Sequence, residues 1–323
     1  ADGAIEIIDQ TALPARTVVR RLSTVEELID AIRSLAVRGA PALGVAGAFG
    51  VALAARQHAG DPDGLTQAVR RLESARPTAV NLARGARQAA ARLADGPEAV
   101  LAEACAVRDA EIAASAAMAA RGADLLTELC GERPRLLTHC NTGGLAAVVG
   151  GTALGVVAEL GRRGALGGVI ASETRPLLQG ARLTAWELTR LGLAFRVAVD
   201  GAGPFLMARG EVDAVILGAD RICANGDVVN KIGTYAHALG AARAGIPFVV
   251  VAPESTVDMA TPSGEAVQIE DRGSAEVTAY AGGVVSPPGT AAVNPAFDVT
   301  PHDLVTAIVT DKRVIRLDRG EKL

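Results

Sequence analysis

The sequence predicts an α/β protein, with a helical N-terminal domain that carries short β segments and a C-terminal domain built on a doubly wound, mostly parallel sheet. Residues 41–131 keep the apolar spacing of helices and show no alternating strand pattern. After residue 134, short apolar runs alternate with stretches long enough for crossover helices, as parallel strands require. The change in pattern predicts two domains, residues 1–128 and 129–323.

The N-terminal elements follow from local signals. Two short β-rich runs, 5–9 and 17–22, predict a small hairpin. Ser23 and Glu26 have the spacing of a capping box, and apolar residues at helical spacing over 25–35 then predict the first helix. Turn signals divide the helical stretch that follows, at 60–64, at Pro77 and at Gly96-Pro97.

Five apolar runs predict the parallel strands of the second domain: 135–139, 169–172, 195–199, 214–217 and 248–251. Segments 152–162, 177–191 and 234–244 are the predicted crossover helices. Ligands bind beyond the carboxyl ends of parallel strands. The polar residues at those ends are Cys140, Asn141, Glu173, Arg175, Asp200, Asp220, Arg221 and Glu254. Any one of them alone is more often a helix cap or a turn former than a functional residue.

Composition excludes several classes of function. The 323 residues are 50% hydrophobic and 21% charged with a formal charge of −4, so we expect a globular chain without a nucleic-acid partner. No apolar stretch approaches the ~20 residues that cross a bilayer, and we expect no membrane association and a cytoplasmic protein. The four cysteines form no CxxC pair and are expected to be free thiols. The four histidines are scattered, and no metal site is predicted.

Glycine-containing strings at the strand ends favour a phosphate-bearing ligand. Residues 138–144 run from a strand into a glycine-rich turn before a helix, where backbone N–H groups can approach an anion. Cys140 in this string is either a reactive thiol or a small buried hydrophobe. His139 is expected on the opposite face of the strand, so adjacency does not support a Cys/His pair. Residues 230–234 add amide and ammonium donors.

Longer strings identify a family. They are 38–44 (RGAPALG), 78–82 (TAVNL), 138–143 (THCNTG), 173–188 (ETRPLLQGARLTAWEL), 218–221 (GADR), 230–234 (NKIGT) and 294–301 (NPAFDVTP). Together they closely resemble the methylthioribose-1-phosphate isomerase family, which is shared with regulatory subunits of a translation-initiation exchange factor and with ribose-1,5-bisphosphate isomerases. The resemblance implies a Rossmann-like second domain, a homodimer, no cofactor, and conversion of 5-methylthioribose 1-phosphate to 5-methylthioribulose 1-phosphate in methionine salvage.

The resemblance also implies site residues. Cys140 and Asp220 are the implied catalytic pair, and the implied substrate-binding residues are Arg38, Gly39, Ala40, Arg87, Gln179, Asn230 and Lys231. Gln88 stands where the family has an arginine, so Arg87 is the expected replacement, with Arg84 second. Other activities remain open: isomerisation of 5-deoxyribose 1-phosphate or ribose 1,5-bisphosphate, or a non-catalytic subunit that senses a sugar phosphate or nucleotide.

A phosphoester at C1 blocks the free aldehyde, so the sugar ring must open before hydrogen moves from C2 to C1. Ring opening needs an acid that keeps its proton near neutral pH. Asp220 follows the apolar run 214–219, and burial there is expected to raise its pKa.

Overall fold

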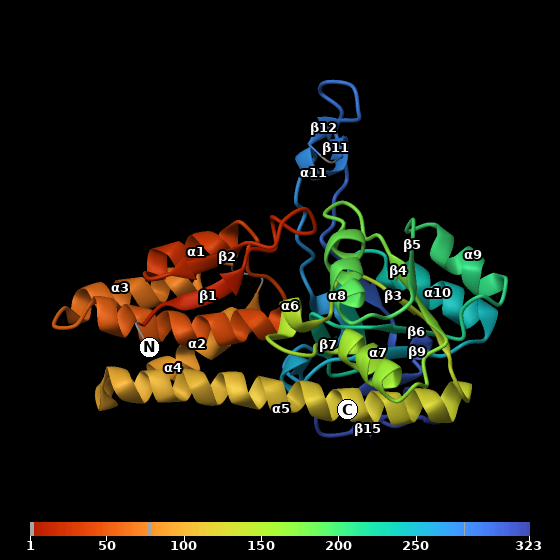
Figure 1. Cartoon of the computed structure of the whole chain (residues 1–323), viewed down its shortest axis with the longest axis horizontal. Helices are drawn as coiled ribbons and strands as arrows, with labels where there is room; N and C mark the ends of the chain where they lie inside the picture. The colour runs from red at the N-terminus through yellow and green to blue at the C-terminus, as the bar shows by residue number, and fades with distance from the viewer. Residues whose placement is uncertain (1–2, 77–78, 281) are drawn as a thin grey trace. The chain divides into compact units, whose positions relative to one another are not determined.

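The computed structural model describes residues 3–76, 79–280 and 282–323, and Pro77 and Thr78 lie outside them. The chain divides into two compact units, which are described one at a time (Figure 1). Unit one comprises Ala1–Ser115 with Gly143–Gly151, and unit two comprises Ala116–Thr142 with Thr152–Leu323. The division falls within the long helix α5 (Pro97–Cys130). The boundary predicted between residues 128 and 129 refers to domains that fold independently. It remains a prediction.

Unit one begins with the predicted β pair, since β1 (Ile5–Ile8) and β2 (Val19–Leu22) run antiparallel. Helix α1 (Val25–Arg33) follows. Its capping box is formed by Thr24 and Glu27, so the prediction of Ser23 with Glu26 was wrong by one residue. Thr24 has the extended backbone of an N-cap, and its hydroxyl accepts the Glu27 N–H while the Glu27 carboxylate accepts the Thr24 N–H.

The rest of unit one is helical, as predicted: α2 (Ala40–Gln57), α3 (Pro62–Glu73), α4 (Val80–Ala90), η1 (Leu93–Asp95), the first part of α5, and the short α6 (Gly144–Ala147). The predicted turn at 60–64 is shorter in the structure, because Asp61 caps α3 and Gly64 lies inside that helix. Helices α2 and α4 pack through glycine. A Cβ on Gly85 would overlap the Gly44 carbonyl oxygen.

Unit two is built on a seven-stranded sheet with the order β15-β14-β9-β6-β3-β4-β5. Its strands are β3 (Arg135–Thr138), β4 (Gly168–Ser172), β5 (Phe195–Ala198), β6 (Ala214–Leu217), β9 (Phe248–Val251), β14 (Ala307–Val309) and β15 (Val314–Ile315). All neighbours are parallel except β14 and β15. The five predicted strands are confirmed. The chain proceeds outward from β3 in one direction and from β6 in the other, so the strand order reverses between these two neighbours.

The connections of unit two include the predicted crossover helices. The predicted segments form α7 (Ala153–Arg162), the π-helical turn η2 (Gly180–Thr184) with α8 (Ala185–Arg190), and α10 (Thr234–Ala244). Helix α9 (Ala202–Ala208), between β5 and β6, was not among them. Short 3₁₀ turns are η3 (Glu254–Thr256), η4 (Gly264–Ala266), η5 (His302–Leu304) and η6 (Leu317–Arg319). The main sheet contributes an apolar core in which every residue of β6 and β9 is buried.

A second sheet in unit two was not predicted. Its order is β10-β7-β8-β13, formed by β7 (Arg221–Cys223), β8 (Val228–Lys231), β10 (Val257–Asp258) and β13 (Phe297–Thr300). It brings the segment around residue 230 beside the segment around residue 298, and β8 pairs antiparallel with both β7 and β13.

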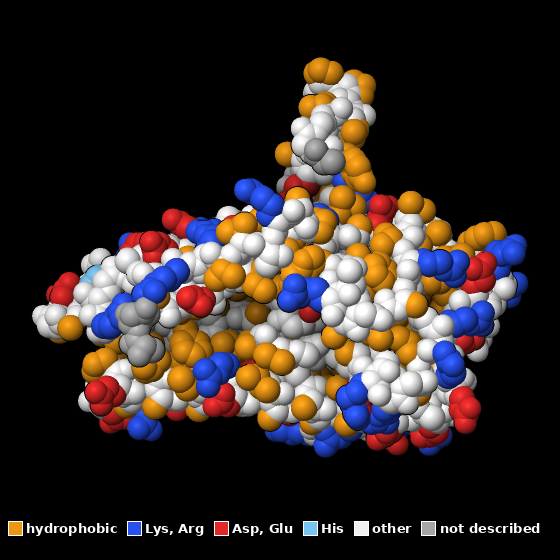
Figure 2. Space-filling model, in the orientation of Figure 1, with side chains coloured by type: hydrophobic (Ala, Val, Ile, Leu, Met, Phe, Trp, Pro, Cys, Tyr) orange, Lys and Arg blue, Asp and Glu red, His pale blue; other side chains and the backbone are white. Residues whose placement is uncertain are grey.

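A hairpin projects from unit two, formed by α11 (Ala275–Thr278), β11 (Ala279–Tyr280) and β12 (Gly283–Val284). Hydrophobic side chains gather along it in Figure 2. Val284, Val285 and Val293 are each more than 60% exposed. Over the described ranges of the chain, we find no helix with both the length and the apolar character of a membrane span.

Candidate active site

Cys140 and Asp220 follow two neighbouring strands of the main sheet. Cys140 lies two residues after the end of β3, and Asp220 lies three residues after the end of β6. Because β3 and β6 are parallel neighbours, their carboxyl ends share one edge of the sheet. The strand order reverses at this pair, which is the position where open α/β sheets bind ligands.

The two residues differ in burial. Cys140 is buried, with 9% exposure, whereas Asp220 is exposed. The apolar surroundings predicted for Asp220 were wrong, because burial ends at Gly218, one residue after β6, and the chain emerges from the core between Gly218 and Asp220.

The backbone of Cys140 is held from both sides. Its φ of 61° lies in the left-handed region, which residues with a Cβ seldom adopt. The Cys140 N–H donates to the Thr174 hydroxyl at 2.8 Å, and the Cys140 carbonyl accepts from the Thr184 hydroxyl at 2.6 Å. The side chain of the next residue, Asn141, donates to Glu187 at 2.7 Å and to Thr184 at 3.3 Å.

Asp200, two residues after the end of β5, organises the loop after β4. Its carboxylate accepts the Thr174 N–H at 2.8 Å, the Arg175 N–H at 2.6 Å and the Ser172 hydroxyl. Burial by itself raises the pKa of Asp200, but these hydrogen bonds outweigh burial, and the pKa lies below its ordinary value. Asp200 is therefore a charged acceptor that fixes backbone donors beside the site.

The histidine beside Cys140 belongs to a separate buried pair. His139 Nε2 donates to the Ile232 carbonyl at 2.8 Å, which leaves Nδ1 as an acceptor 3.3 Å from His237 Nε2. Burial lowers the pKa of both rings, that of His237 to about 3. Both are neutral near pH 7 and link the segment before Cys140 to the segment after Lys231.

Asn230 and Asp298 lie directly opposite each other in the second sheet. The Asp220 N–H donates to the Val229 carbonyl, so Asp220 lies beside Val229, which is also the strand partner of Arg221. Directly opposed residues share a face of a sheet. The Asn230 amide donates to Thr234 at 2.9 Å.

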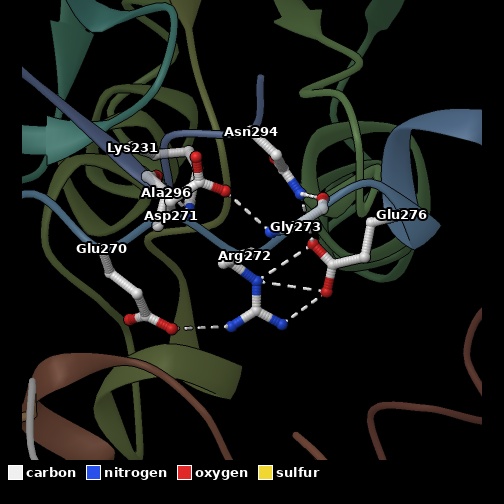
Figure 3. Close-up of polar contacts among 8 residues, drawn as sticks. All are labelled: Lys231, Glu270, Asp271, Arg272, Gly273, Glu276, Asn294 and Ala296. Atoms are coloured by element: carbon white, nitrogen blue, oxygen red, sulfur yellow. Dashed lines mark hydrogen bonds and ion pairs between the residues drawn. The ribbon is translucent and has the colours of Figure 1, made fainter. Parts of the chain in front are cut away.

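Gln179 and Lys231 present polar groups from two different segments. The Gln179 Oε1 atom is buried and has no hydrogen-bond partner among the described residues. Lys231 Nζ donates to the Ala296 carbonyl at 2.7 Å and lies 4.6 Å from the centre of the Phe297 ring. Figure 3 shows Lys231 beside the base of the projecting hairpin.

A partly buried ion-pair network at that base was missed by sequence reasoning. Arg272 pairs with Glu276 and with Glu270, and Asn294 donates to Glu276 at 3.2 Å (Figure 3). Arg175, from the loop after β4, donates to backbone carbonyls of the same hairpin. No local pattern reveals the Arg175 contacts, because those carbonyls lie 101 and 102 residues away in the sequence.

The remaining predicted residues lie in unit one. Gly39 is the N-cap of α2 with a φ of 98°, between Arg38 and the first helical residue, Ala40. A Cβ on Gly39 would overlap the backbone of Ala146 in α6, so glycine is required there. Arg87 is exposed and forms an ion pair of 3.4 Å with Glu73.

Gln88, which stands at the position of the family's arginine, also has a partner within unit one. Its side-chain amide donates to Glu103 at 2.8 Å. Arg84 is exposed on the same helix.

Comparison with known proteins identifies relatives over nearly the whole chain. The model of the initiation factor 2 subunit family matches residues 36–316. A methylthioribose-1-phosphate isomerase of Anaeromyxobacter sp. is 52% identical over 97% of this chain and 91% of its own length. A 5-deoxyribose 1-phosphate isomerase of Moorella thermoacetica is 49% identical over 98% of this chain and 92% of its own length.

Two further similarities concern a longer protein and a solved structure. A probable bifunctional methylthioribose-1-phosphate isomerase/methylthioribulose-1-phosphate dehydratase of Nocardia farcinica is 54% identical over 97% of this chain, which spans only 58% of that relative's length. The crystal structure of 5-methylthioribose 1-phosphate isomerase from Pyrococcus horikoshii has a TM-score of 0.90 and 40% identity, over 98% of this chain and 91% of that one.

Proposed function

This chain belongs to the initiation factor 2 subunit family, and from that premise we propose that it converts 5-methylthioribose 1-phosphate to 5-methylthioribulose 1-phosphate. The reaction is an aldose–ketose isomerisation within methionine salvage. The observation that carries the proposal is the placement of Cys140 and Asp220 beyond adjacent parallel strands, where the strand order reverses.

The chemistry requires one proton to enter and one to leave. The ring oxygen takes a proton as its bond to C1 breaks, which gives the open chain a hydroxyl at C4. Hydrogen then moves from C2 to C1, and the C2 hydroxyl loses its proton as it becomes the carbonyl. Asp220 is the proposed proton carrier, and Cys140 is the proposed group beside the migrating hydrogen, within the buried part of the site.

The first test is turnover by the purified protein, followed by phosphorus and proton NMR of the sugar phosphate. We expect Asp220→Asn and Cys140→Ser each to lower kcat by about 10²- to 10⁴-fold, the range of a lost proton-transfer group. Cys130→Ser is the matched control, because its half-buried thiol donates to the backbone carbonyl of Asp213, outside the proposed site. Near-normal turnover in either site variant would remove that residue from the chemistry.

The proposed substrate contacts are Arg38, Gly39, Ala40, Arg87, Gln179, Asn230 and Lys231. Two features of unit two support this assignment. The unpartnered Oε1 of Gln179 can accept a hydrogen bond from a sugar hydroxyl, and the Lys231 ammonium, held against a carbonyl, supplies a localised positive charge for phosphate.

The substituent at C5 is the open point of specificity. The similarity to a 5-deoxyribose 1-phosphate isomerase favours that sugar as a second substrate. Burying a methylthio group in place of hydrogen contributes about 1–3 kcal/mol of discrimination. Ratios of kcat/KM for the two sugars and for ribose 1,5-bisphosphate measure it directly. A preference for the bisphosphate, or binding of nucleotides without turnover, would move the assignment to the other branches of the family.

Three further features complete the proposal. A Rossmann-like, doubly wound arrangement is proposed for unit two, and the order 3-2-1-4-5-6 of the parallel strands supports it. The reaction is redox-neutral overall and needs no organic cofactor. We expect a cytoplasmic homodimer. Analytical ultracentrifugation of the Val284→Asp variant tests whether the exposed apolar hairpin contributes to the dimer interface.

A further inference from the structure

Cys140 has a backbone conformation that the surrounding chain must maintain. Its positive φ places the Cβ in a sterically unfavourable position for an L-residue, and such conformations persist only where neighbouring contacts enforce them. Both main-chain polar groups of Cys140 are taken by threonine hydroxyls from segments 34 and 44 residues away. We call Thr174 and Thr184 the threonine clamp.

Each half of the threonine clamp is itself fixed. Thr174 is fully buried, donates its hydroxyl proton to the Ser172 carbonyl at 3.0 Å, and has its own N–H held by Asp200 at 2.8 Å. Its hydroxyl oxygen is thereby left as an acceptor aimed at the Cys140 N–H, so the hydrogen-bond direction is defined.

Thr184 reaches Cys140 because of the unusual turn that carries it. The π-helical turn η2 begins at Gly180, where a Cβ would overlap the Ser172 carbonyl oxygen. This close approach of backbone to backbone places the last residue of η2, Thr184, against the Cys140 carbonyl at 1% exposure. Single π-turns of this kind are frequent at functional sites.

The two hydrogen bonds act on the main chain of Cys140 and leave its thiol free for chemistry. We propose that Thr174 and Thr184 are positioning residues of the isomerisation, which hold Cys140 in the left-handed conformation and so set where its Sγ atom lies relative to the sugar. This inference rests on the proposed function for its link to turnover. The geometry of Cys140 itself can be tested without any substrate.

The test replaces each clamp residue with valine, which keeps the shape and removes the hydroxyl. Thr138→Val is the matched control, because Thr138 is also buried, lies two residues before Cys140, and has a hydroxyl without a partner among the described residues. We expect Thr174→Val and Thr184→Val to lower kcat about 10- to 100-fold with little change in KM, since misplacement of a reacting group costs rate rather than binding. Serine at either position keeps the hydroxyl and should restore most of kcat.

A second readout follows the thiol directly. Alkylation by iodoacetamide, measured at each cysteine by peptide mass spectrometry, should speed up at Cys140 in both valine variants, because the released loop exposes a thiol that is now 9% exposed. Cys130 is the internal reference. If wild-type protein fails to isomerise the sugar while alkylation behaves as expected, the proposed function is refuted and the clamp geometry stands.

The remaining outcomes overturn the inference. Valine variants with the kcat and the alkylation rate of Thr138→Val would show that the hydroxyls do not position Cys140. Loss of folding in both valine variants, with Thr138→Val folded, would assign the threonines a role in stability alone. Serine variants as impaired as the valine variants would also contradict the proposal.

Discussion

Asp298 provides a prediction about the pH dependence of stability. Its carboxylate lies at the start of α10 and accepts the Gly233 N–H at 2.7 Å and the Tyr235 N–H at 3.2 Å, while its other oxygen is buried without a partner among the described residues. Burial raises the pKa of Asp298 from 3.8 to about 6, despite these hydrogen bonds and nearby Lys231.

The sign follows from proton linkage. Between pH 3.8 and about 6 the folded protein holds a proton at Asp298 that the unfolded chain releases, so stability falls as the pH rises through this window. A shift of about two units corresponds to about 3 kcal/mol at 1.36 kcal/mol per unit. Asparagine does not titrate and resembles the protonated acid. We therefore expect Asp298→Asn to match wild type near pH 4 and to exceed its free energy of unfolding by about 2–3 kcal/mol at pH 7.

The assay uses the single tryptophan, Trp186, which lies in α8 of unit two and reports on the unit that contains Asp298. Urea unfolding followed by its fluorescence is compared at pH 4, 5, 6 and 7. Asp213→Asn is the control with the opposite sign, because hydrogen bonds from Arg135 lower the pKa of Asp213 and make its charged form stabilising. A stability difference for Asp298→Asn that does not change with pH, or that favours wild type at pH 7, would refute the reasoning.

Two further predictions concern glycine packing and phosphate binding. Gly180→Ala should lower both the unfolding midpoint in urea and kcat, because its Cβ overlaps the Ser172 carbonyl oxygen; Gly201→Ala, with open space around it, should change neither. Arg38→Ala and Arg87→Ala should chiefly raise KM, as expected for contacts shared by the ground and transition states. An unchanged KM in steady-state assays of Arg87→Ala, with a raised KM in Arg84→Ala, would assign the family's contact to Arg84.

Local patterns were sufficient to predict much of the fold. The strands β3, β4, β5, β6 and β9 and the helix α10 follow from apolar runs and helical spacing, which depend on neighbouring residues only. Where two overlapping segments fit the same local pattern, the pattern does not predict which of them the structure uses. Ser23 with Glu26 and Thr24 with Glu27 both have capping-box spacing, and the backbone conformation at Thr24 decides between them.

In the candidate site, too, sequence position predicted some features and only the folded structure decided others. Position after an apolar run placed Cys140 and Asp220 among the polar candidates at the strand ends, and the family resemblance then singled out the two as a pair. The pairing of β3 with β6 places their carboxyl ends at one edge of the sheet. Sequence could not determine that Asp220 is exposed, or that burial raises the pKa of Asp298 above its ordinary value. Desolvation depends on everything that packs around a group, including distant segments.

The threonine clamp depends entirely on tertiary structure. The string 173–188 was conspicuous in the sequence, yet nothing in it indicates that Thr174 and Thr184 bond to opposite sides of one residue. That arrangement arises because the loop after β4 and the turn η2 fold back over the end of β3. The sequence by itself determined which residues form strands and helices and which polar groups follow them, because those features are local. Only the tertiary structure decided their burial, hydrogen-bond partners and backbone strain, because these depend on contacts between segments far apart in the chain.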